Sequence, residues 1–118
     1  MITQGIYKIT CAGKVYIGQT INMDRRLKQH IYNSSRVNTP FYRALSTQKW
    51  DFTPLEQVDK ANLNKREIYW IDHYDSFRKG WNRTIGGDND YNSSIRKLRE
   101  QKNKETVTVA INPTSSSQ

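Results

Sequence analysis

An acidic residue on the apolar face of a predicted helix is the first candidate for chemistry in this sequence. Glu67 lies four residues after Leu63 and four before Ile71, so a helix places all three on one face. A carboxylate that faces inward is costly unless it is paired, hydrogen-bonded or bound to a metal ion. Two interpretations follow: a buried salt bridge, for example to an arginine of an earlier helix, or a metal ligand or acid–base group in a cleft.

Two phenol groups form the second candidate. Tyr7 and Tyr16 lie on opposite sides of a small-residue break at Gly13, in a segment rich in Ile, Val, Tyr and Thr that predicts a β-hairpin. Each tyrosine has a glycine within two residues, Gly5 or Gly18, which allows a backbone or a ligand to come close. The hairpin either presents two phenols near each other or packs both in a sheet with their hydroxyl groups hydrogen-bonded.

The next helix carries an arginine and a histidine one turn apart. Asn22 is a suitable N-cap for a helix from Met23 to Asn33, on which Arg26 and His30 are four residues apart. These two side chains lie on the shoulder of the apolar face. The residues expected to form that face are Met23, Leu27 and Ile31.

Three further elements complete the predicted domain. They are a short helix over 41–48 that begins at Pro40, an irregular strand over 50–58 that contains Pro54, and a helix over 65–74 that bears Glu67. We predict a fold of the α/β (α+β) class, with a small three-stranded antiparallel sheet flanked by helices. The domain is expected to end near residue 92.

Basic residues outnumber acidic ones, 19 against 11, which gives a net charge of +8 and indicates a polyanion partner such as nucleic acid. Residues 24–49 hold six basic residues and one acidic residue, a net charge of +5. That segment forms either a solvated face or one that follows phosphate groups. Residues 93–118 are expected to form a basic tail, with a short helix, a small strand at 106–109 and a disordered Ser-rich end.

Nothing in the sequence indicates a membrane or an oxidising compartment. Cys11 is the single cysteine, so no internal disulfide is expected, and it is assigned to the core rather than to a reactive site. We find no apolar run of about 18 residues and no secretory signal at the N-terminus. We therefore expect a cytoplasmic protein without a membrane association.

The order of these residues resembles the GIY-YIG nuclease family. The two tripeptides that name the family stand unaltered as Gly5-Ile6-Tyr7 and Tyr16-Ile17-Gly18. The residues that follow them in the family's order are Arg26, His30, Glu67 and Asn82. The resemblance covers residues 4–92 and is greatest to the catalytic domains of phage and intron-encoded homing endonucleases. Trp81 stands where the family often has tyrosine, a mild departure.

The resemblance implies hydrolysis of a DNA phosphodiester bond with one divalent cation, Mg²⁺ or Mn²⁺, to leave 5′-phosphate and 3′-hydroxyl ends. Glu67 would be the protein ligand of the ion, and Arg26 would contact the non-bridging oxygens of the phosphate. Tyr7 would be the general base, which requires neighbouring positive charge because a phenol titrates near ~10. His30 would relay or accept the proton, or orient Tyr7, and Tyr16 would position phosphate or water.

Other residues are assigned supporting parts by the same resemblance. Gly18 would let the sheet surface approach the sugar–phosphate chain, and Asn82 would hold the helix of Glu67 across the site. The partner is double-stranded DNA, with the protein favoured as a monomer. The residues expected to contact the DNA are Arg25, Arg26, Lys28, Arg36 and Arg43.

The biological setting leaves several alternatives. Homing enzymes of this type usually carry a separate DNA-binding region after the nuclease domain, whereas little except a basic stretch follows Tyr91. Either the chain is a fragment, or its choice of target comes from the nuclease surface and the tail. The alternative functions are a nucleic-acid-binding module without catalysis and a structure-specific repair or restriction nuclease. The expected location is the interior of a bacterial or phage-infected cell.

Overall fold

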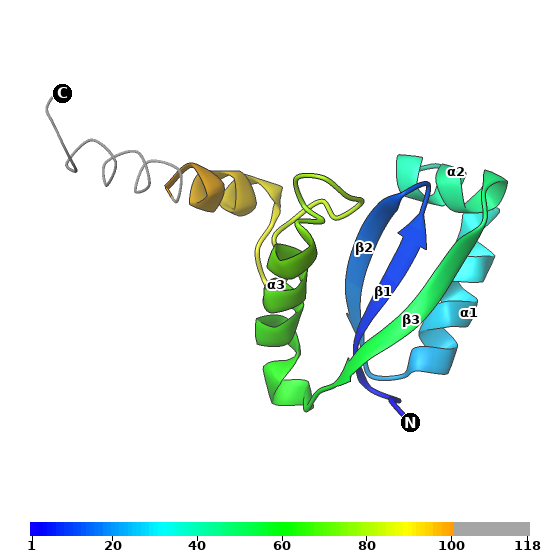
Figure 1. The fold of residues 1–118 in the computed structure, drawn as a ribbon, viewed down its shortest axis with the longest axis horizontal. Coiled ribbons are helices and arrows are strands. Elements are labelled where there is room, and N and C mark those ends of the chain that lie inside the picture. The colour runs from blue at the N-terminus through cyan, green and yellow to red at the C-terminus, as the bar shows by residue number, and fades with distance from the viewer. Residues whose placement is uncertain (101–118) are drawn as a thin grey trace, which may run out of the picture.

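A computed structural model describes residues 1–100 of the 118-residue chain. Its elements, in chain order, are β1 (Gly5–Cys11), β2 (Lys14–Thr20), α1 (Met23–Ser34), α2 (Pro40–Thr47), β3 (Trp50–Gln57), the 3-10 turn η1 (Lys60–Asn62) and α3 (Leu63–Tyr74), shown in Figure 1. Residues 91–100 form a further helix that points away from the sheet. The strand predicted at 106–109 and the Ser-rich end lie outside the described residues. Among the described helices, none has both the length and the apolar character needed to cross a membrane.

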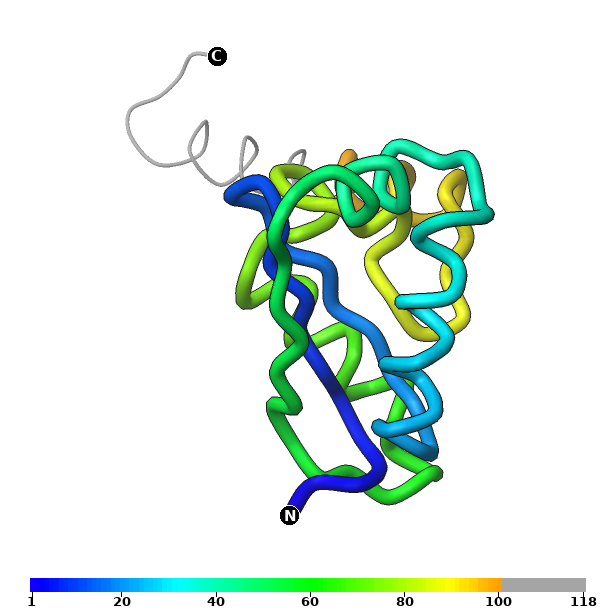
Figure 2. Tube along the Cα trace, turned by 90° about the vertical axis from the view of Figure 1, so that its right-hand side faces the viewer, coloured from blue at the N-terminus to red at the C-terminus, as the bar shows by residue number. Residues whose placement is uncertain are grey.

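The sheet is antiparallel with the strand order β2-β1-β3, which confirms the predicted three-stranded architecture. Figure 2 shows β1 running between the other two strands. Because β1 is central and both of its faces are covered, Ile6 is buried on one face while Tyr7 and Ile9 are buried on the other. This explains why the strand does not alternate cleanly between apolar and polar residues.

The third strand is irregular, as its proline predicted. On the edge strand β3, Glu56 pairs with Ile6 but Pro54 pairs with Tyr7, so Leu55 is an extra residue at a register shift. Proline is tolerated on an edge strand because its missing N–H removes no interior ladder hydrogen bond.

Two hydrophobic clusters cover the two faces of the sheet. On the first face, α1 and α2 pack over a cluster centred on Tyr7, Ile9 and Leu45. On the opposite face, α3 packs Leu63 and Ile71 against the sheet. Figure 1 shows the resulting order of layers, with α3 on one side of the strands and α1 on the other. Residues that could act together must therefore meet around an edge of the sheet rather than across its middle.

The helix starts follow the capping residues in the sequence. Asn22 accepts a hydrogen bond from the backbone N–H of Arg25 at 3.0 Å, and Thr39 accepts one from the N–H of Tyr42 at 3.3 Å, with Pro40 in the first turn of α2. These contacts confirm the predicted starts of α1 and α2.

The prediction of which residues form the buried face of α1 is partly wrong. Its buried residues are Met23 and His30, whereas Ile31 is 53% exposed. Helix α1 is therefore rotated so that a histidine, not an isoleucine, faces the sheet. A buried imidazole needs hydrogen-bond partners for both ring nitrogens, and the sheet and α2 provide them, as the site geometry shows.

Candidate active site

Tyr7 lies flat across Gly18 on the neighbouring strand. The two residues are directly paired between β1 and β2, and a Cβ atom built on Gly18 would collide with the hydroxyl oxygen and Cζ of Tyr7. The space above Gly18 is thus filled by the phenol. The glycine makes room for Tyr7, while the approach of a sugar–phosphate chain to Gly18 stays a prediction.

The two phenols of the hairpin are neighbours on one face of the sheet. Their ring centroids are 6.2 Å apart, as expected for diagonal partners in an antiparallel pair. Phe52 stacks on Tyr7 at 4.6 Å, and Phe41 stacks on Tyr16 at 4.7 Å. Both interpretations of the hairpin therefore hold together: the phenols lie close to each other and are packed in the core.

Arg26 connects α1 to the first phenol. Its Nε donates a hydrogen bond to the Tyr7 hydroxyl oxygen at 3.2 Å, and its Nη1 donates to Gln29 at 2.6 Å. Burial raises the pKa of Tyr7 above its ordinary value, and the positive charge of Arg26 only partly opposes this effect. Tyr7 is therefore a neutral phenol near neutral pH, because the positive charge of Arg26 does not outweigh the effect of burial.

His30 stands between two tyrosines. Its Nε2 is hydrogen-bonded to the hydroxyl of Tyr7 at 2.7 Å, and its Nδ1 to the hydroxyl of Tyr42 at 2.9 Å. The side chain is 1% exposed, and burial, assisted by the charge of Arg26, lowers the pKa of His30 to about 4. At neutral pH the ring is uncharged, so one nitrogen donates to a tyrosine and the other accepts.

Tyr42 is a functional candidate that the sequence did not reveal. Besides its bond to His30, its hydroxyl oxygen accepts a hydrogen bond from Asn33 Nδ2 at 3.3 Å. Because Tyr42 is on α2 and His30 is on α1, no helical spacing relates them, and only the packing of the two helices brings them together. The aromatic pair Phe41–Tyr42 after a helix start was the available signal, and it indicates core packing more readily than a site.

Glu67 approaches the phenols from the other side of the sheet. Its Oε1 accepts hydrogen bonds from Gln19 Nε2 at 3.1 Å, on β2, and from the backbone N–H of Gly87 at 2.8 Å. No ion pair within residues 1–100 involves this carboxylate, so the buried salt bridge is not observed. Burial is the main cause of a raised pKa at Tyr16, and the negative charge of Glu67 adds to it. The carboxylate therefore acts electrostatically on Tyr16.

The carboxylate of Glu67 suits a hard divalent cation. Within the described residues, hydrogen bonds reach only its Oε1, which leaves Oε2 for another ligand. No group of three or more His, Cys, Asp and Glu residues occurs in residues 1–100, so a closed zinc site has no ligand set there. Mg²⁺ is commonly held by one or two carboxylates together with water and substrate phosphate. Glu67 fits that mode of binding.

Asn82 fastens the loop after α3 to the edge of the sheet. Its Oδ1 accepts hydrogen bonds from the N–H of Ile17 at 2.8 Å and from Ser76 Oγ at 2.7 Å, and its Nδ2 donates to the carbonyl of Ile17 at 2.8 Å. The side-chain amide thus pairs with β2 as a neighbouring strand would. Because Ser76 closely follows α3, this contact also fixes the helix that bears Glu67.

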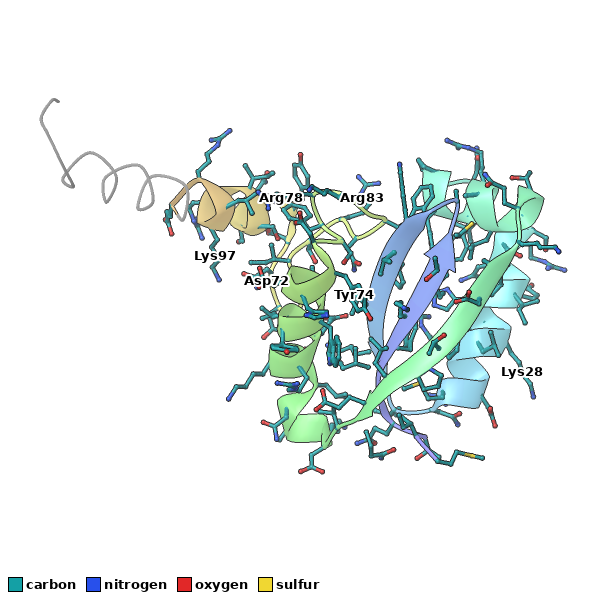
Figure 3. All side chains as sticks on the ribbon, in the orientation of Figure 1. Lys28, Asp72, Tyr74, Arg78, Arg83 and Lys97 are labelled. Carbon is teal, nitrogen blue, oxygen red and sulfur yellow. The ribbon has the colours of Figure 1, made fainter. Side chains whose placement is uncertain are left out.

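The five predicted DNA contacts do not form one cluster. Arg26 is in the site, while Arg25 and Lys28 are exposed on α1; Figure 3 shows Lys28 directed away from the sheet. Arg36 and Arg43 are exposed and line a pocket at the connection between α1 and α2.

Comparisons with known proteins were made for the sequence and for the fold. A family model described as the GIY-YIG catalytic domain matches residues 3–82. The solved catalytic domain of homing endonuclease I-TevI matches with a TM-score of 0.61 and 24% identity, over 68% of this chain and 97% of that chain. A glutamate-to-alanine mutant of the catalytic domain of intron endonuclease I-TevI matches with a TM-score of 0.62 and 22% identity. That match covers 75% of this chain and 99% of the other chain. A search of curated proteins finds no match.

The fold and the matched family model together define an endonuclease catalytic domain. The chain belongs to the GIY-YIG family, since the family model covers more than half of it, and the resemblance seen in the sequence is confirmed. Nucleases of this family generally depend on a divalent metal ion.

Substitution of Gly18 tests the placement of Tyr7. We expect Gly18→Ala to lower the free energy of unfolding by about 1–3 kcal/mol, because the new methyl group overlaps the phenol. The displaced Tyr7 would also lose its bonds to Arg26 and His30. Thermal unfolding and a plasmid-nicking assay measure both effects. Unchanged stability and activity would show that the phenol does not lie across this glycine.

The titration of His30 tests its burial. With a pKa of about 4 when folded and 6.5 ordinarily, the histidine binds its proton first in the unfolded state. We expect the free energy of unfolding to decrease as the pH falls from 6.5 toward 4. Imidazole NMR shifts and urea titrations measure the two quantities. An NMR midpoint near 6.5 would contradict the buried, neutral ring.

Substitution of Tyr42 tests whether it orients His30. We expect Tyr42→Phe to reduce kcat by about 10-fold or more, with KM nearly unchanged, because the ring nitrogen Nδ1 loses its partner while the core packing is kept. The pH dependence of kcat should shift as well, a change that a purely structural role would not produce. Wild-type kcat with a wild-type pH profile would remove Tyr42 from the site.

Proposed function

We propose that this chain is a Mg²⁺-dependent DNA endonuclease, with Mn²⁺ as an alternative ion, that hydrolyses phosphodiester bonds to 5′-phosphate and 3′-hydroxyl ends. The observation that carries the proposal is the hydrogen-bonded cluster of Tyr7, Arg26 and His30. Tyr16 packs beside Tyr7, and the negative charge of Glu67 contributes to the raised pKa of Tyr16. The fold likeness to the catalytic domain of a homing endonuclease favours a homing or mobile-element nuclease.

Glu67 is the residue that would hold the divalent ion, through the carboxylate oxygen that has no protein hydrogen bond in residues 1–100. When bound, the ion supplies positive charge to the phosphate oxygens and to the departing 3′ oxygen. Gln19 and the N–H of Gly87 hold the other carboxylate oxygen and orient the group.

Proton transfer from the attacking water is assigned to Tyr7 and His30 acting together. Because burial raises the pKa of Tyr7, the phenol would act as a shuttle. Its side chain is buried in the free protein, so this step requires the attacking water to enter beside the hydroxyl when DNA binds. The oxygen of Tyr7 then takes a proton from that water while its own proton moves to Nε2 of His30, 2.7 Å away. The resulting hydroxide attacks phosphorus, the bond from phosphorus to the 3′ oxygen breaks, and that oxygen takes a proton from solvent. Nε2 of His30 can accept the proton because the ring is uncharged at neutral pH, and the lowered pKa of His30 means that the proton is then released readily.

Arg26 is assigned the stabilisation of the negative charge that develops on the phosphate. Its Nε donates a hydrogen bond to Tyr7 and its Nη1 donates one to Gln29, so the guanidinium group is already oriented before a substrate binds. A preorganised cation in a partly buried site stabilises negative charge more strongly than one in water. Tyr16 packs beside Tyr7, and the negative charge of Glu67 acts on its hydroxyl group. We assign Tyr16 the role of positioning the phosphate or the water.

The decisive experiment compares wild type with Glu67→Gln in nicking of supercoiled plasmid DNA with Mg²⁺. Glutamine keeps an oxygen that can accept from Gln19 and Gly87, so the fold should be retained while the anionic ligand is lost. We expect the rate to fall by at least about 100-fold, and EDTA to abolish wild-type cleavage.

Lys60→Gln is the matched control, because Lys60 lies on η1, is exposed, and is not assigned to the site. It should cleave at the wild-type rate. Cleavage by Glu67→Gln at the rate of this control would reject Glu67 as the ligand. An inactive wild type with Mg²⁺ and with Mn²⁺ would reject the endonuclease proposal itself.

A further inference from the structure

Two arginines outside the catalytic cluster share a pocket. An open pocket of about 210 Å³ lies where α1 connects to α2. Arg36 and Arg43 line it, together with Asn38 and three serines of the two helices and their connection. The pocket is small, polar and positively charged, which suits a compact anion better than a base or an apolar ligand.

Both guanidinium groups are held in place by neutral partners. The Cζ of Arg36 is 3.8 Å from the centroid of the Tyr32 ring, and its Nη1 donates to the Tyr32 carbonyl at 3.3 Å and to Ser35 Oγ at 3.0 Å. Arg43 Nη1 donates to Asn38 Oδ1 at 2.9 Å. These contacts orient two long side chains before any ligand arrives, which reduces the entropy that binding would remove.

The pocket lacks an acidic partner. Within residues 1–100, no ion pair involves Arg36 or Arg43, and the hydrogen bonds of both engage only Nη1. The remaining N–H groups of each arginine form the planar fork that binds phosphate oxygens in pairs. Ser34 and Ser46 donate their hydroxyl hydrogens to helix carbonyls, so the donors available to an anion are mainly those of the guanidinium groups.

The pocket lies beyond the C-terminal end of the helix that contributes to the candidate active site. Arg26, in the site, is on α1, and Arg36, in the pocket, is two residues after the last residue of α1, Ser34. At 1.5 Å of rise per residue, the ten residues between them correspond to about 15 Å along the helix axis. The pocket is therefore separate from the catalytic cluster but carried by the same helix.

We propose that the pocket of Arg36 and Arg43 binds a backbone phosphate of the DNA substrate at a position away from the phosphate that is cleaved. This inference rests on the proposed function, because it assigns a second contact to the same substrate. The pocket contributes affinity and sets the position of the strand over the site, and it takes no part in the chemistry.

The test is the double substitution Arg36→Gln with Arg43→Gln. The matched control, Lys60→Gln with Lys65→Gln, removes the same two charges from η1 and from α3, on the face of the sheet opposite α1. Binding to a short fluorescent duplex is measured in EDTA over a series of salt concentrations. We expect the arginine variant to bind more weakly and the magnitude of its slope of log K against log salt to decrease by about one, because a single phosphate contact is lost. The lysine control should keep the wild-type slope.

Cleavage assays on the same variants separate this inference from the proposed function. The arginine variant should show a raised KM with a wild-type kcat. If wild type cleaves but both double variants lose slope equally, general charge rather than the pocket is responsible, and the inference is rejected. An unchanged slope in the arginine variant rejects it as well. If wild type binds the duplex with the expected slope but never cleaves, the proposed function fails while the phosphate pocket stands.

Discussion

The hydroxyl group of Tyr7 is buried between the sheet and α1, and the positions of its neighbours follow from the need to satisfy it. Tyr7 is fully buried, and a polar group left unsatisfied there would cost about 1–3 kcal/mol. Two hydrogen-bond partners of the hydroxyl, Arg26 and His30, come from α1. Helix α1 must therefore turn its polar side to the sheet, which leaves Ile31 exposed to solvent.

The partners of Tyr7 need partners themselves, and this extends the network outward. His30 engages Tyr42 on α2, and Tyr42 in turn accepts from Asn33 on α1. Within residues 1–100, no buried side-chain nitrogen or oxygen lacks a hydrogen bond. A fully connected network in a medium of low dielectric is rigid. One buried hydroxyl thereby links three elements, β1, α1 and α2, and holds the groups that act on the substrate in a fixed arrangement.

Local signals predict the secondary structure of this domain well. The break at Gly13, the cap at Asn22 and the Thr39-Pro40 helix start each act over a few residues, and each marks a boundary that the structure contains. The family resemblance singled out Tyr7, Arg26 and His30, which the structure joins by hydrogen bonds, but it did not supply the surroundings of the candidate residues. The contact between Gln19 and Glu67, for example, joins strand β2 to helix α3, which are 48 residues apart at these positions.

What the sequence could not supply depends on packing between distant segments. A hydropathy pattern counts His30 as polar, so the rotation of α1 is invisible until Tyr7 and Tyr42 are known to contact it. The neutral state of Tyr7 has the same origin, because burial outweighs the adjacent Arg26, and burial is a property of the folded chain. The sequence marked Gly18 as a position where another group comes close to the backbone, and in the structure that group is the ring of Tyr7.

A sheet of only three strands has two open edges, and an open edge invites pairing with the edge of another molecule. Both edges are obstructed here. On β3, Pro54 and the register shift at Leu55 break the row of backbone groups, and on β2 the amide of Asn82 already occupies the N–H and carbonyl of Ile17. Asn82 therefore has two effects: it fixes the position of the helix that bears Glu67, and it prevents the exposed edge of β2 from pairing with a strand of another molecule. Loss of this side chain would be expected to reduce solubility as well as catalysis.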